Sequence, residues 1–304
     1  MRKLRVGMVG LGGIAQKAYL PTLTKEMDWE FVGAFSPSPD RRKRICKLYR
    51  IEEFSSLSHL AENCDAIFVH STTASHFEVV SELLMKGIDV YVDKPLASTI
   101  SEAERLVELS EKHKRKLMVG FNRRFAPMYM EAKKMAGQFD WVRFEKHRMN
   151  GIGPNSYEFT MLDDYIHVVD TVRWLADDNL KMMYENMHLN NENQLIHAQH
   201  TFESSQKAAF TTAMHRNAGA DLEHLRLFAD GVVISVENMY TMKIEQNGTI
   251  TTKTPPSWET VGKQRGFENA IKHFIACIQN DEQPIVDGLE GLKTQIAVEA
   301  LLKK

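Results

Sequence analysis

The spacing of apolar residues changes near residue 121 and divides the chain into two parts. In the first part, short continuous apolar runs alternate with helical patterns. The runs are Leu4–Val9, Phe31–Phe35, Ala66–Val69, Val90–Val92 and Leu117–Phe121. Continuous runs of this kind are typical of strands buried on both faces, as in a parallel sheet covered by helices. We therefore predict an α/β fold with a doubly wound parallel sheet in the first part.

Helix boundaries between these strands are marked by capping residues. Ser38 and Pro39 have the identities of an N-cap and a first helical position, and the helix should continue through Leu48. Ser101–Glu104 has the spacing of a capping box, which predicts a helix to about Lys114. In a sheet of this type, ligands bind beyond the carboxyl ends of the strands, so candidate site residues are sought there.

The second part alternates apolar and polar residues. A strand is predicted at Trp141–His147 and a helix at Leu162–Leu175. Period-two runs follow at Leu195–Phe202, Ala208–Met214, Leu225–Phe228, Val232–Val236 and Met242–Glu245. Asp230-Gly231 and Asn247-Gly248 are hairpin turn sequences, which predicts a largely antiparallel open sheet.

The end of the chain completes the predicted second domain. Residues 249–262 are expected to form a loop, and Phe267–Gln279 and Gly288–Leu302 have the pattern of amphipathic helices. We place the domains at residues 1–122 and 123–304. Leu225, Leu227 and Phe228 put apolar residues on both sides of one strand. An exposed apolar sheet face usually marks an interface, so we expect a homodimer or a larger homo-oligomer.

Composition narrows the class of protein. The 304 residues are 43% hydrophobic and carry a net charge of −2, which is ordinary for a soluble protein. No basic stretch is long enough to suggest nucleic-acid binding, and no apolar run is long enough for a membrane span. Cys46, Cys64 and Cys277 lack metal-binding spacing and are odd in number, so we expect no metal site and a reducing cytoplasm.

The turn after the first predicted strand has the sequence Gly10-Leu11-Gly12-Gly13-Ile14-Ala15. Gly10 permits a tight turn, Gly12 lets the backbone approach a pyrophosphate, and Ala15 lets the next helix pack closely on the strand. The pyrophosphate would rest on free N–H groups at the start of that helix. Spacing alone leaves the alternative open, because many strand–helix turns carry two glycines without binding a ligand.

After the second strand, no carboxylate stands where one would bind a ribose 2′-hydroxyl. Ser36 and Ser38 are there instead, followed by Arg41 and Arg42. Hydroxyl and guanidinium groups suit a 2′-phosphate, which favours NADP over NAD without excluding dual use. The other interpretation is a helix cap followed by surface arginines.

The next two strand ends carry small hydroxyl residues and a lysine. Ser71 and Thr72 follow the third strand, with His76 shortly after. Small hydroxyl residues here can line a cofactor, and the alternative is that Thr73 or Ser75 only caps the next helix. Asp93-Lys94-Pro95 follows the fourth strand; the proline holds Lys94 extended, and the bond between them can be cis. Lys94 can point its ammonium into the strand-end crevice or be an ordinary strand-ending lysine.

One predicted helix in the second part carries a carboxylate and an imidazole. Asp163 and His167 are four residues apart and share a helix face. A neighbouring carboxylate raises the proton affinity of a histidine and orients its ring, which suits a general base. The pair can also be a helix start with a structural histidine, or two ligands of a metal, for which no third ligand is recognisable.

Taken together, these segments resemble the Gfo/Idh/MocA oxidoreductases over nearly the whole chain. The resemblance is carried by the glycine turn, Asp65–Val69 with His76, Asp93-Lys94-Pro95, Gly120–Phe125 and the Asp163-x-x-x-His167 helix. It is strongest to the MviM-like branch, through residues 71–76, Lys146–Arg148, residues 162–171 and Met214–Arg216.

The resemblance implies an N-terminal Rossmann domain and a C-terminal α/β domain whose open sheet mediates homo-oligomers. It implies NAD or NADP bound near Lys94 and a sugar-like, cyclitol or polyol substrate between the domains. The implied cofactor-binding residues are Gly10, Gly12, Gly13, Ile14, Ala15, Ser71, Thr72, His76, Asp93, Lys94 and Asn122.

The implied reaction is hydride transfer between a secondary alcohol and the nicotinamide. His167 would be the base, Asp163 would orient it, and Lys94 would bind the same oxygen. Arg124 and Arg148 are secondary candidates for substrate contacts. Thr160-Met161 replaces the glycines usual before the Asp163 helix, and Ser71-Thr72 replaces the usual Thr-Pro. These differences weaken any assignment of the substrates of better-known relatives to this chain.

The sequence is also compatible with two other functions. Tightly held NAD can support elimination or glycoside cleavage of a sugar without net redox change. Alternatively, the chain can be a non-catalytic NAD(P)-binding sensor in which Asp163 and His167 are structural.

Overall fold

The computed structural model describes residues 2–302, which form two compact units. Of these residues, unit 1 comprises 2–121 and Phe267–Ile296, and unit 2 comprises Asn122–Gly266 and 297–302. The first predicted boundary was after residue 122, and the compact units divide one residue earlier. Phe267–Ile296, which the prediction placed in the second domain, is grouped with unit 1.

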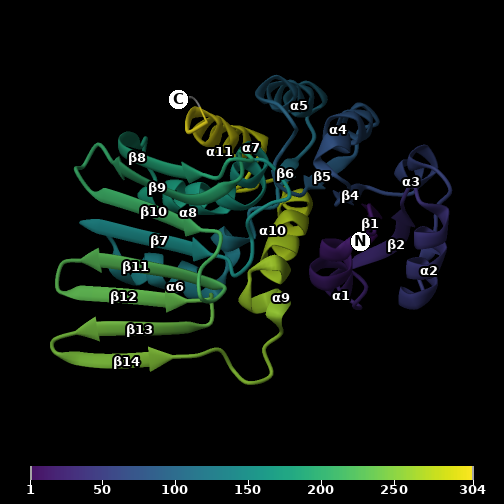
Figure 1. Cartoon of the computed structure of the whole chain (residues 1–304). Helices are drawn as coiled ribbons and strands as arrows, with labels where there is room; N and C mark the ends of the chain where they lie inside the picture. The colour runs from purple at the N-terminus through teal and green to yellow at the C-terminus, as the bar shows by residue number, and fades with distance from the viewer. Residues whose placement is uncertain (1, 303–304) are drawn as a thin grey trace. The chain divides into compact units, whose positions relative to one another are not determined.

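Unit 1 is built on a six-stranded parallel sheet with the strand order β3-β2-β1-β4-β5-β6 (Figure 1). The strands are β1 (Leu4–Val9), β2 (Trp29–Phe35), β3 (Glu52–Glu53), β4 (Ala66–Val69), β5 (Asp89–Val92) and β6 (Leu117–Val119). Every residue of β4 and β5 is buried. The doubly wound parallel sheet is therefore confirmed. β3 was not predicted, because its two residues are exposed glutamates without an apolar pattern.

Seven helical segments of unit 1 connect successive strands of its sheet: η1 (Ala15–Tyr19), α1 (Leu20–Leu23), α2 (Pro39–Tyr49), α3 (Leu57–Glu62), η2 (Thr73–Ser75), α4 (His76–Met85) and α5 (Ile100–His113). Two further helices come from the end of the chain: α10 (Phe267–Gln279) belongs to unit 1, and α11 (Gly288–Ala300) begins in unit 1 and ends in unit 2. α2 begins after Ser38, as predicted. The capping box of α5 is Thr99 with Glu102, two residues before the predicted one. Ser101 has the same spacing to an acidic residue but lies inside the first helical turn.

The returning segment completes the core of unit 1. α10 buries Ala270, Ile271, Phe274, Ile275 and Cys277. The ring of Phe274 lies 5.5 Å from that of Phe68 and 5.7 Å from that of Tyr91. The amphipathic pattern correctly predicted a helix with one buried face, but it contained no information about which sheet that face would cover.

Unit 2 contains an eight-stranded sheet with the order β14-β13-β12-β11-β7-β10-β9-β8. Its strands are β7 (Trp141–His147), β8 (Lys181–Leu189), β9 (Leu195–Glu203), β10 (Ala209–His215), β11 (Leu222–Ala229), β12 (Val232–Glu237), β13 (Thr241–Gln246) and β14 (Thr249–Lys253). β7 and β10 are parallel and the other neighbours are antiparallel, which confirms a largely antiparallel sheet.

The two edge strands of this sheet were not predicted. β14 lies in the segment 249–262 that was expected to be a loop, so that prediction was wrong at its start. β8 is exposed over most of its length. An edge strand without a buried face lacks the alternation of apolar and polar residues from which strands are inferred.

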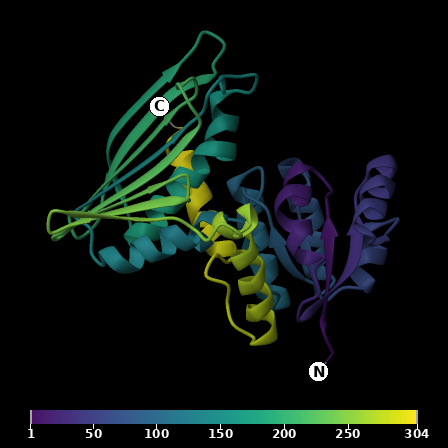
Figure 2. The same ribbon diagram turned by 90° about the horizontal axis from the view of Figure 1, so that it is seen from below.

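Helices cover one face of this sheet and leave the other open (Figure 2). α6 (Pro127–Ala136) contacts β11, β12 and β13, and α8 (Ile166–Ala176) contacts β7 and β10. The remaining helical segments are η3 (Asn122–Phe125), α7 (Tyr157–Thr160), η4 (Met161–Tyr165) and α9 (Val261–Gln264). Within residues 2–302, no helix has the length and apolar character needed to cross a bilayer.

β11 carries apolar residues on both sides, as predicted. Leu225 and Leu227 are fully buried, whereas the neighbouring Phe228 is half-buried and its ring stacks on that of Trp141 at 4.5 Å. A row of histidines also crosses this sheet, in which His215 pairs with His197 and His197 pairs with His188.

Candidate active site

The turn after β1 lies at the switch point of the parallel sheet, where β1 has β2 on one side and β4 on the other. Gly10 has φ +91°, and a Cβ there would lie 2.5 Å from the carbonyl carbon and oxygen of His70. The His70 N–H donates to the Val9 carbonyl at 2.7 Å. The chain segments after β1 and β4 therefore run in direct contact, and only glycine fits at position 10.

The rest of the glycine turn is open. A Cβ at Gly12 or Gly13 would meet no atom within 4 Å. Ala15 is fully buried, as predicted, and the Gln16 N–H donates to the Gly12 carbonyl at 3.2 Å, so a helical turn starts directly beyond the glycines. Clear space beside the backbone, followed at once by a helical turn, fits a dinucleotide pyrophosphate.

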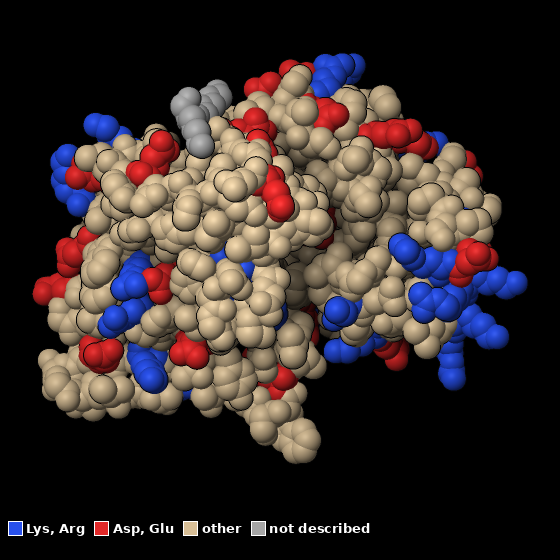
Figure 3. Space-filling model, in the orientation of Figure 1, with Lys and Arg blue, Asp and Glu red and all other residues tan. Residues whose placement is uncertain are grey.

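The loop after β2 is held by Arg42. Its Nη1 donates to the Ser36 carbonyl at 2.8 Å, its Nε donates to Glu53 at 2.9 Å, and its guanidinium lies over the Phe35 ring. Arg42 therefore braces this loop. Of the other predicted phosphate ligands, Ser36 is buried, whereas Ser38 and Arg41 are exposed. Lys and Arg side chains gather over α2 on the face shown in Figure 3.

His76 ties two strand-end loops together. Its Nδ1 lies 2.9 Å from the Pro95 carbonyl and its Nε2 lies 3.2 Å from the Ser71 carbonyl. Burial lowers the pKa of His76, and a neutral imidazole can donate to only one of the two oxygens. The ring therefore positions the loop after β4 against the loop after β5, rather than presenting itself to solvent.

Lys94 follows β5 at the same edge of the sheet. Its N–H donates to Asp93 Oδ1 at 2.9 Å, its side chain is partly exposed, and the Lys94–Pro95 bond is cis as the sequence suggested. A Cβ at Gly120, after β6, would lie 3.3 Å from the Asp93 Cα. Unit 1 thus places Gly10, Ser71 and Lys94 on adjacent strand ends.

In unit 2, Asp163 and His167 belong to different helical segments. Asp163 is exposed within the π-helical turn η4, and His167 is partly buried in the first turn of α8. The regular helix predicted from Leu162 therefore begins with a π turn. Such turns occur frequently at functional sites. The His167 carbonyl accepts a hydrogen bond from Thr171 at 2.8 Å.

η4 is fixed to the sheet through Tyr165. The Tyr165 hydroxyl lies 2.7 Å from His200 Nδ1 and 2.7 Å from Thr212 Oγ1. His200 is completely buried, and this burial lowers the pKa of His200 to about 4. It is thus a neutral core histidine near pH 7, and it anchors the segment that carries Asp163.

Two predicted site residues, Arg124 and Asn122, and the intervening Arg123 form hydrogen bonds with other residues of unit 2. Arg124 Nη2 donates to Asp170 at 2.7 Å, and both side chains are almost fully buried, which favours a structural role for Arg124. Arg123 forms a bidentate pair with Glu223 at 2.8 and 2.6 Å. Asn122, predicted to bind cofactor, donates from its amide to the Arg265 carbonyl at 2.7 Å.

Sequence reasoning missed the most highly charged cluster of unit 2. Asp164 accepts hydrogen bonds from Arg148 Nε at 2.9 Å and Nη2 at 3.0 Å, and it also pairs with Lys146 and Arg216. Burial alone would raise the pKa of Asp164, but the cations outweigh it and hold that pKa well below its usual range. The adjacent aspartates in the sequence gave no sign of which one faced inward.

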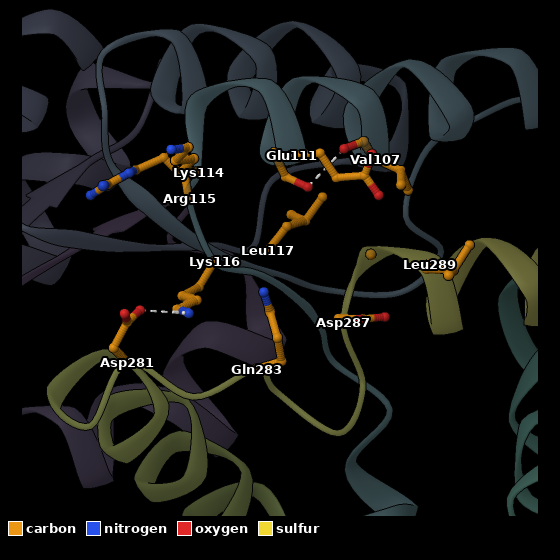
Figure 4. A pocket seen from close by; sticks show the side chains of 12 residues that line it. Val107, Glu111, Lys114, Arg115, Lys116, Leu117, Asp281, Gln283, Asp287 and Leu289 are labelled. Atoms are coloured by element: carbon orange, nitrogen blue, oxygen red, sulfur yellow. Dashed lines mark hydrogen bonds and ion pairs between the residues drawn. The ribbon is translucent and has the colours of Figure 1, made fainter.

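Unit 1 also has a polar cavity of about 400 Å³ (Figure 4). It lies between the end of α5, the start of β6 and the segment after α10, with Lys116 paired to Asp281 at 2.9 Å. The start of β6 is at the amino-terminal edge of the sheet. This cavity is therefore separate from the strand ends that carry Gly10, Ser71 and Lys94.

A glycine turn at the switch point of a doubly wound sheet, joined to an open-sheet unit, is typical of NAD(P)-dependent oxidoreductases. Comparisons agree. Residues 4–121 match the model of the oxidoreductase family with an NAD-binding Rossmann fold, and residues 127–247 match the YceM-like C-terminal domain. The chain is 48% identical to YceM of Salmonella typhimurium, over 99% of this chain and 98% of that protein. It therefore belongs to the Gfo/Idh/MocA family.

Other relatives support the same assignment. The crystal structure of the MviM dehydrogenase of Clostridium difficile superimposes with a TM-score of 0.97 at 43% identity, covering 99% of each chain. An inositol 2-dehydrogenase/D-chiro-inositol 3-dehydrogenase of Halalkalibacterium halodurans is 25% identical over 99% of this chain and 90% of its own. The predicted resemblance is confirmed, and the chain is a dehydrogenase of this family.

Substitutions at Gly10 and Gly12 should have different effects. Gly10→Ala should lower the free energy of unfolding by about 2 kcal/mol or more, because φ is positive and the new Cβ meets backbone. Gly12→Ala should change it by less than about 0.5 kcal/mol, yet weaken NAD(P) binding at least about tenfold, since its Cβ enters space needed by the ligand. Urea unfolding and fluorescence titration measure the two effects. Full cofactor affinity in Gly12→Ala would show that the pyrophosphate does not bind here.

Proposed function

We propose that this chain transfers hydride between NAD(P) and a secondary alcohol or ketone of a sugar, cyclitol or related polyol. The observation that carries the proposal is the placement of Lys94 on the same sheet edge as the glycine turn of unit 1. An ammonium beside a bound dinucleotide can bind the reacting oxygen. The inositol dehydrogenase among the relatives supports a polyol-like substrate.

Several residues of unit 1 are suited to hold the cofactor. The backbone of Gly10–Ala15 would hold the pyrophosphate, and Ser71, Thr72 and Asp93 would line the adjoining strand ends. His76 is a positioning residue, because its ring contacts the backbones of both loops. When bound, NAD(P) supplies the redox chemistry.

The protein's own groups handle the proton and the developing charge. Loss of hydride from the carbinol carbon leaves a hydroxyl proton that must be removed. In this proposal His167 accepts that proton at a ring nitrogen, and Asp163 orients the imidazole. The Lys94 ammonium donates a hydrogen bond to the same oxygen and stabilises its negative charge.

His167→Ala should reduce turnover by about 10²- to 10⁴-fold, the usual contribution of a positioned acid or base, and leave NAD(P) affinity nearly unchanged. Lys94→Ala should reduce turnover similarly and also weaken cofactor binding. The assay follows free NAD(P)H with the compound that the wild type uses best from a polyol and keto-sugar panel. NAD(P)H release also separates this reaction from sugar elimination without net redox change.

His188→Ala is the matched control for His167→Ala, because His188 is an exposed histidine of the same unit. It should retain full turnover. Turnover within about threefold of wild type in His167→Ala would show that His167 is not the base, since a positioned base contributes far more.

We further propose that NADP is preferred over NAD. The loop after β2 carries no carboxylate to bind a bare ribose, and the exposed Ser38 and Arg41 can donate to phosphate oxygens. Arg42 holds the loop in shape through Ser36 and Glu53. The gathering of basic side chains over α2 supports the same preference (Figure 3).

Arg41→Ala should weaken NADP binding about tenfold, through loss of a charge-assisted hydrogen bond, and leave NAD binding unchanged. Arg44→Ala removes the same charge from another exposed position of α2 and should have little effect. Calorimetric titration of both oxidised cofactors provides the measurement. Tighter binding of NAD by the wild type, or unchanged NADP affinity in Arg41→Ala, would overturn this preference.

We also propose that the open face of the eight-stranded sheet pairs with a second copy of the chain. Wild type should scatter light as a dimer or larger species at micromolar concentration. Trp141→Glu should favour smaller species, because it places a charge in the stacked Trp141–Phe228 pair. Trp258→Glu is the matched control, because Trp258 is 93% exposed, and it should leave the size of the assembly unchanged. A monomeric wild type would contradict the proposal.

A further inference from the structure

The Asp164 cluster contains more positive than negative charge. Lys146 lies on β7, Arg148 follows that strand, and Arg216 follows the parallel neighbour β10. All three side chains converge on the single carboxylate of Asp164. A single carboxylate of unit 2 therefore forms ion pairs with three basic side chains.

Neighbouring groups do not remove this excess. Arg123 and Glu223 form a bidentate pair and balance each other. Asp221 lies close enough to raise the pKa of Arg148, but its carboxylate is exposed and accepts the Met149 N–H at 2.8 Å. When Lys146 is protonated, Asp164 and Asp221 together still leave one positive charge without a carboxylate. Charges that are partly buried are normally paired, so the protonated cluster is suited to take up an anion.

Both arginines retain donors for such an anion. Arg148 uses Nε and Nη2 for Asp164, and Arg216 uses Nε for the Gly151 carbonyl and Nη1 for Asp164. Within residues 2–302, Arg148 Nη1 and Arg216 Nη2 make no hydrogen bond, and neither is enclosed. The Arg148 side chain is 39% exposed, against 14% for Arg216 and 3% for Lys146, so Arg148 forms the accessible rim.

The cluster lies close in sequence to the proposed catalytic base, because Asp164 in η4 is three residues before His167 in the first turn of α8. We propose that Arg148 and Arg216 form a subsite for an anionic oxygen group, a carboxylate or a phosphate, of the substrate. This inference rests on the proposed function, since it takes the ligand to be the molecule on which His167 acts. It narrows the substrate class to acidic or phosphorylated polyols.

The state of Lys146 gives the subsite a pH dependence. Burial, reinforced by repulsion from Arg123, lowers the pKa of Lys146 to about 7. A bound anion favours the charged ammonium. As the pH falls below 7, Lys146 becomes protonated, so the affinity for a carboxylate rises toward its maximum. Affinity falls as the pH rises above 7, and binding above pH 7 is accompanied by proton uptake.

Calorimetric titration of the NADP-bound protein tests the subsite with three probes: D-glucuronate, D-glucose 6-phosphate and neutral D-glucose. At least one anionic probe should bind wild type about 10- to 100-fold more tightly than glucose, the range expected for charge-assisted hydrogen bonds. The tighter of the two anions identifies carboxylate or phosphate as the recognised group. Its affinity should fall between pH 7 and 8.5, while glucose binding stays constant.

Arg148→Gln should remove most of the preference for the anion. Arg143→Gln removes the same charge from an exposed side chain on β7 and should keep it, which controls for net charge. Arg148→Lys, which restores the charge without the guanidinium fork, should retain part of the preference. This variant also decides the question if Arg148→Gln does not fold, because complete retention in Arg148→Lys with weak salt dependence would refute anion recognition.

Equal binding of anionic and neutral probes by wild type, no detectable binding of either anion, or an unchanged preference in Arg148→Gln would each overturn the subsite. The binding measurement requires no turnover. Anion preference without hydride transfer would therefore refute the proposed function alone, whereas turnover of neutral polyols without anion preference would refute the subsite alone.

Discussion

The arrangement of unit 1 depends on the close approach of the chain after β1 to the chain after β4. Because Gly10 has no side chain, the two backbones meet directly at the switch point. His76 connects the loop after β4 to the loop after β5, because its ring lies between the carbonyls of Ser71 and Pro95. The position of Lys94 therefore depends on these loop contacts and on the absence of a side chain at Gly10.

Unit 2 uses buried polar groups to hold its functional segment. The π turn η4 is fixed by the Tyr165 hydroxyl to His200 and Thr212, and by Asp164 to three basic side chains. A buried polar group that loses its partner is costly, so these hydrogen bonds favour one arrangement of the segment. The exposed Asp163 and the partly buried His167 therefore lie beside two residues, Asp164 and Tyr165, that are held by polar contacts.

Local chemistry could be predicted from the sequence where the determining residues are adjacent in the chain. The glycine turn, the Ser38–Pro39 helix start and most strands of both sheets belong to this class. Edge strands such as β8 and β14 could not be found, because they lack a buried face. The partners of Arg42, Arg124 and Asn122 come from distant segments, so the sequence could not show that these side chains were already engaged. The role of Asp164 depends on η4, which no periodicity in the sequence encodes.

The return of Phe267–Ile296 to unit 1 affects the order in which the protein can fold during synthesis. The rings of Phe68 and Tyr91 are covered by Phe274 of α10, which leaves the ribosome only after the whole of the second sheet. Contacts so distant in sequence form slowly, and apolar surface that awaits them is prone to aggregation. The nascent nucleotide-binding unit therefore passes through a stage in which its sheet is made but part of its core is uncovered. Its completion is coupled to synthesis of the other unit.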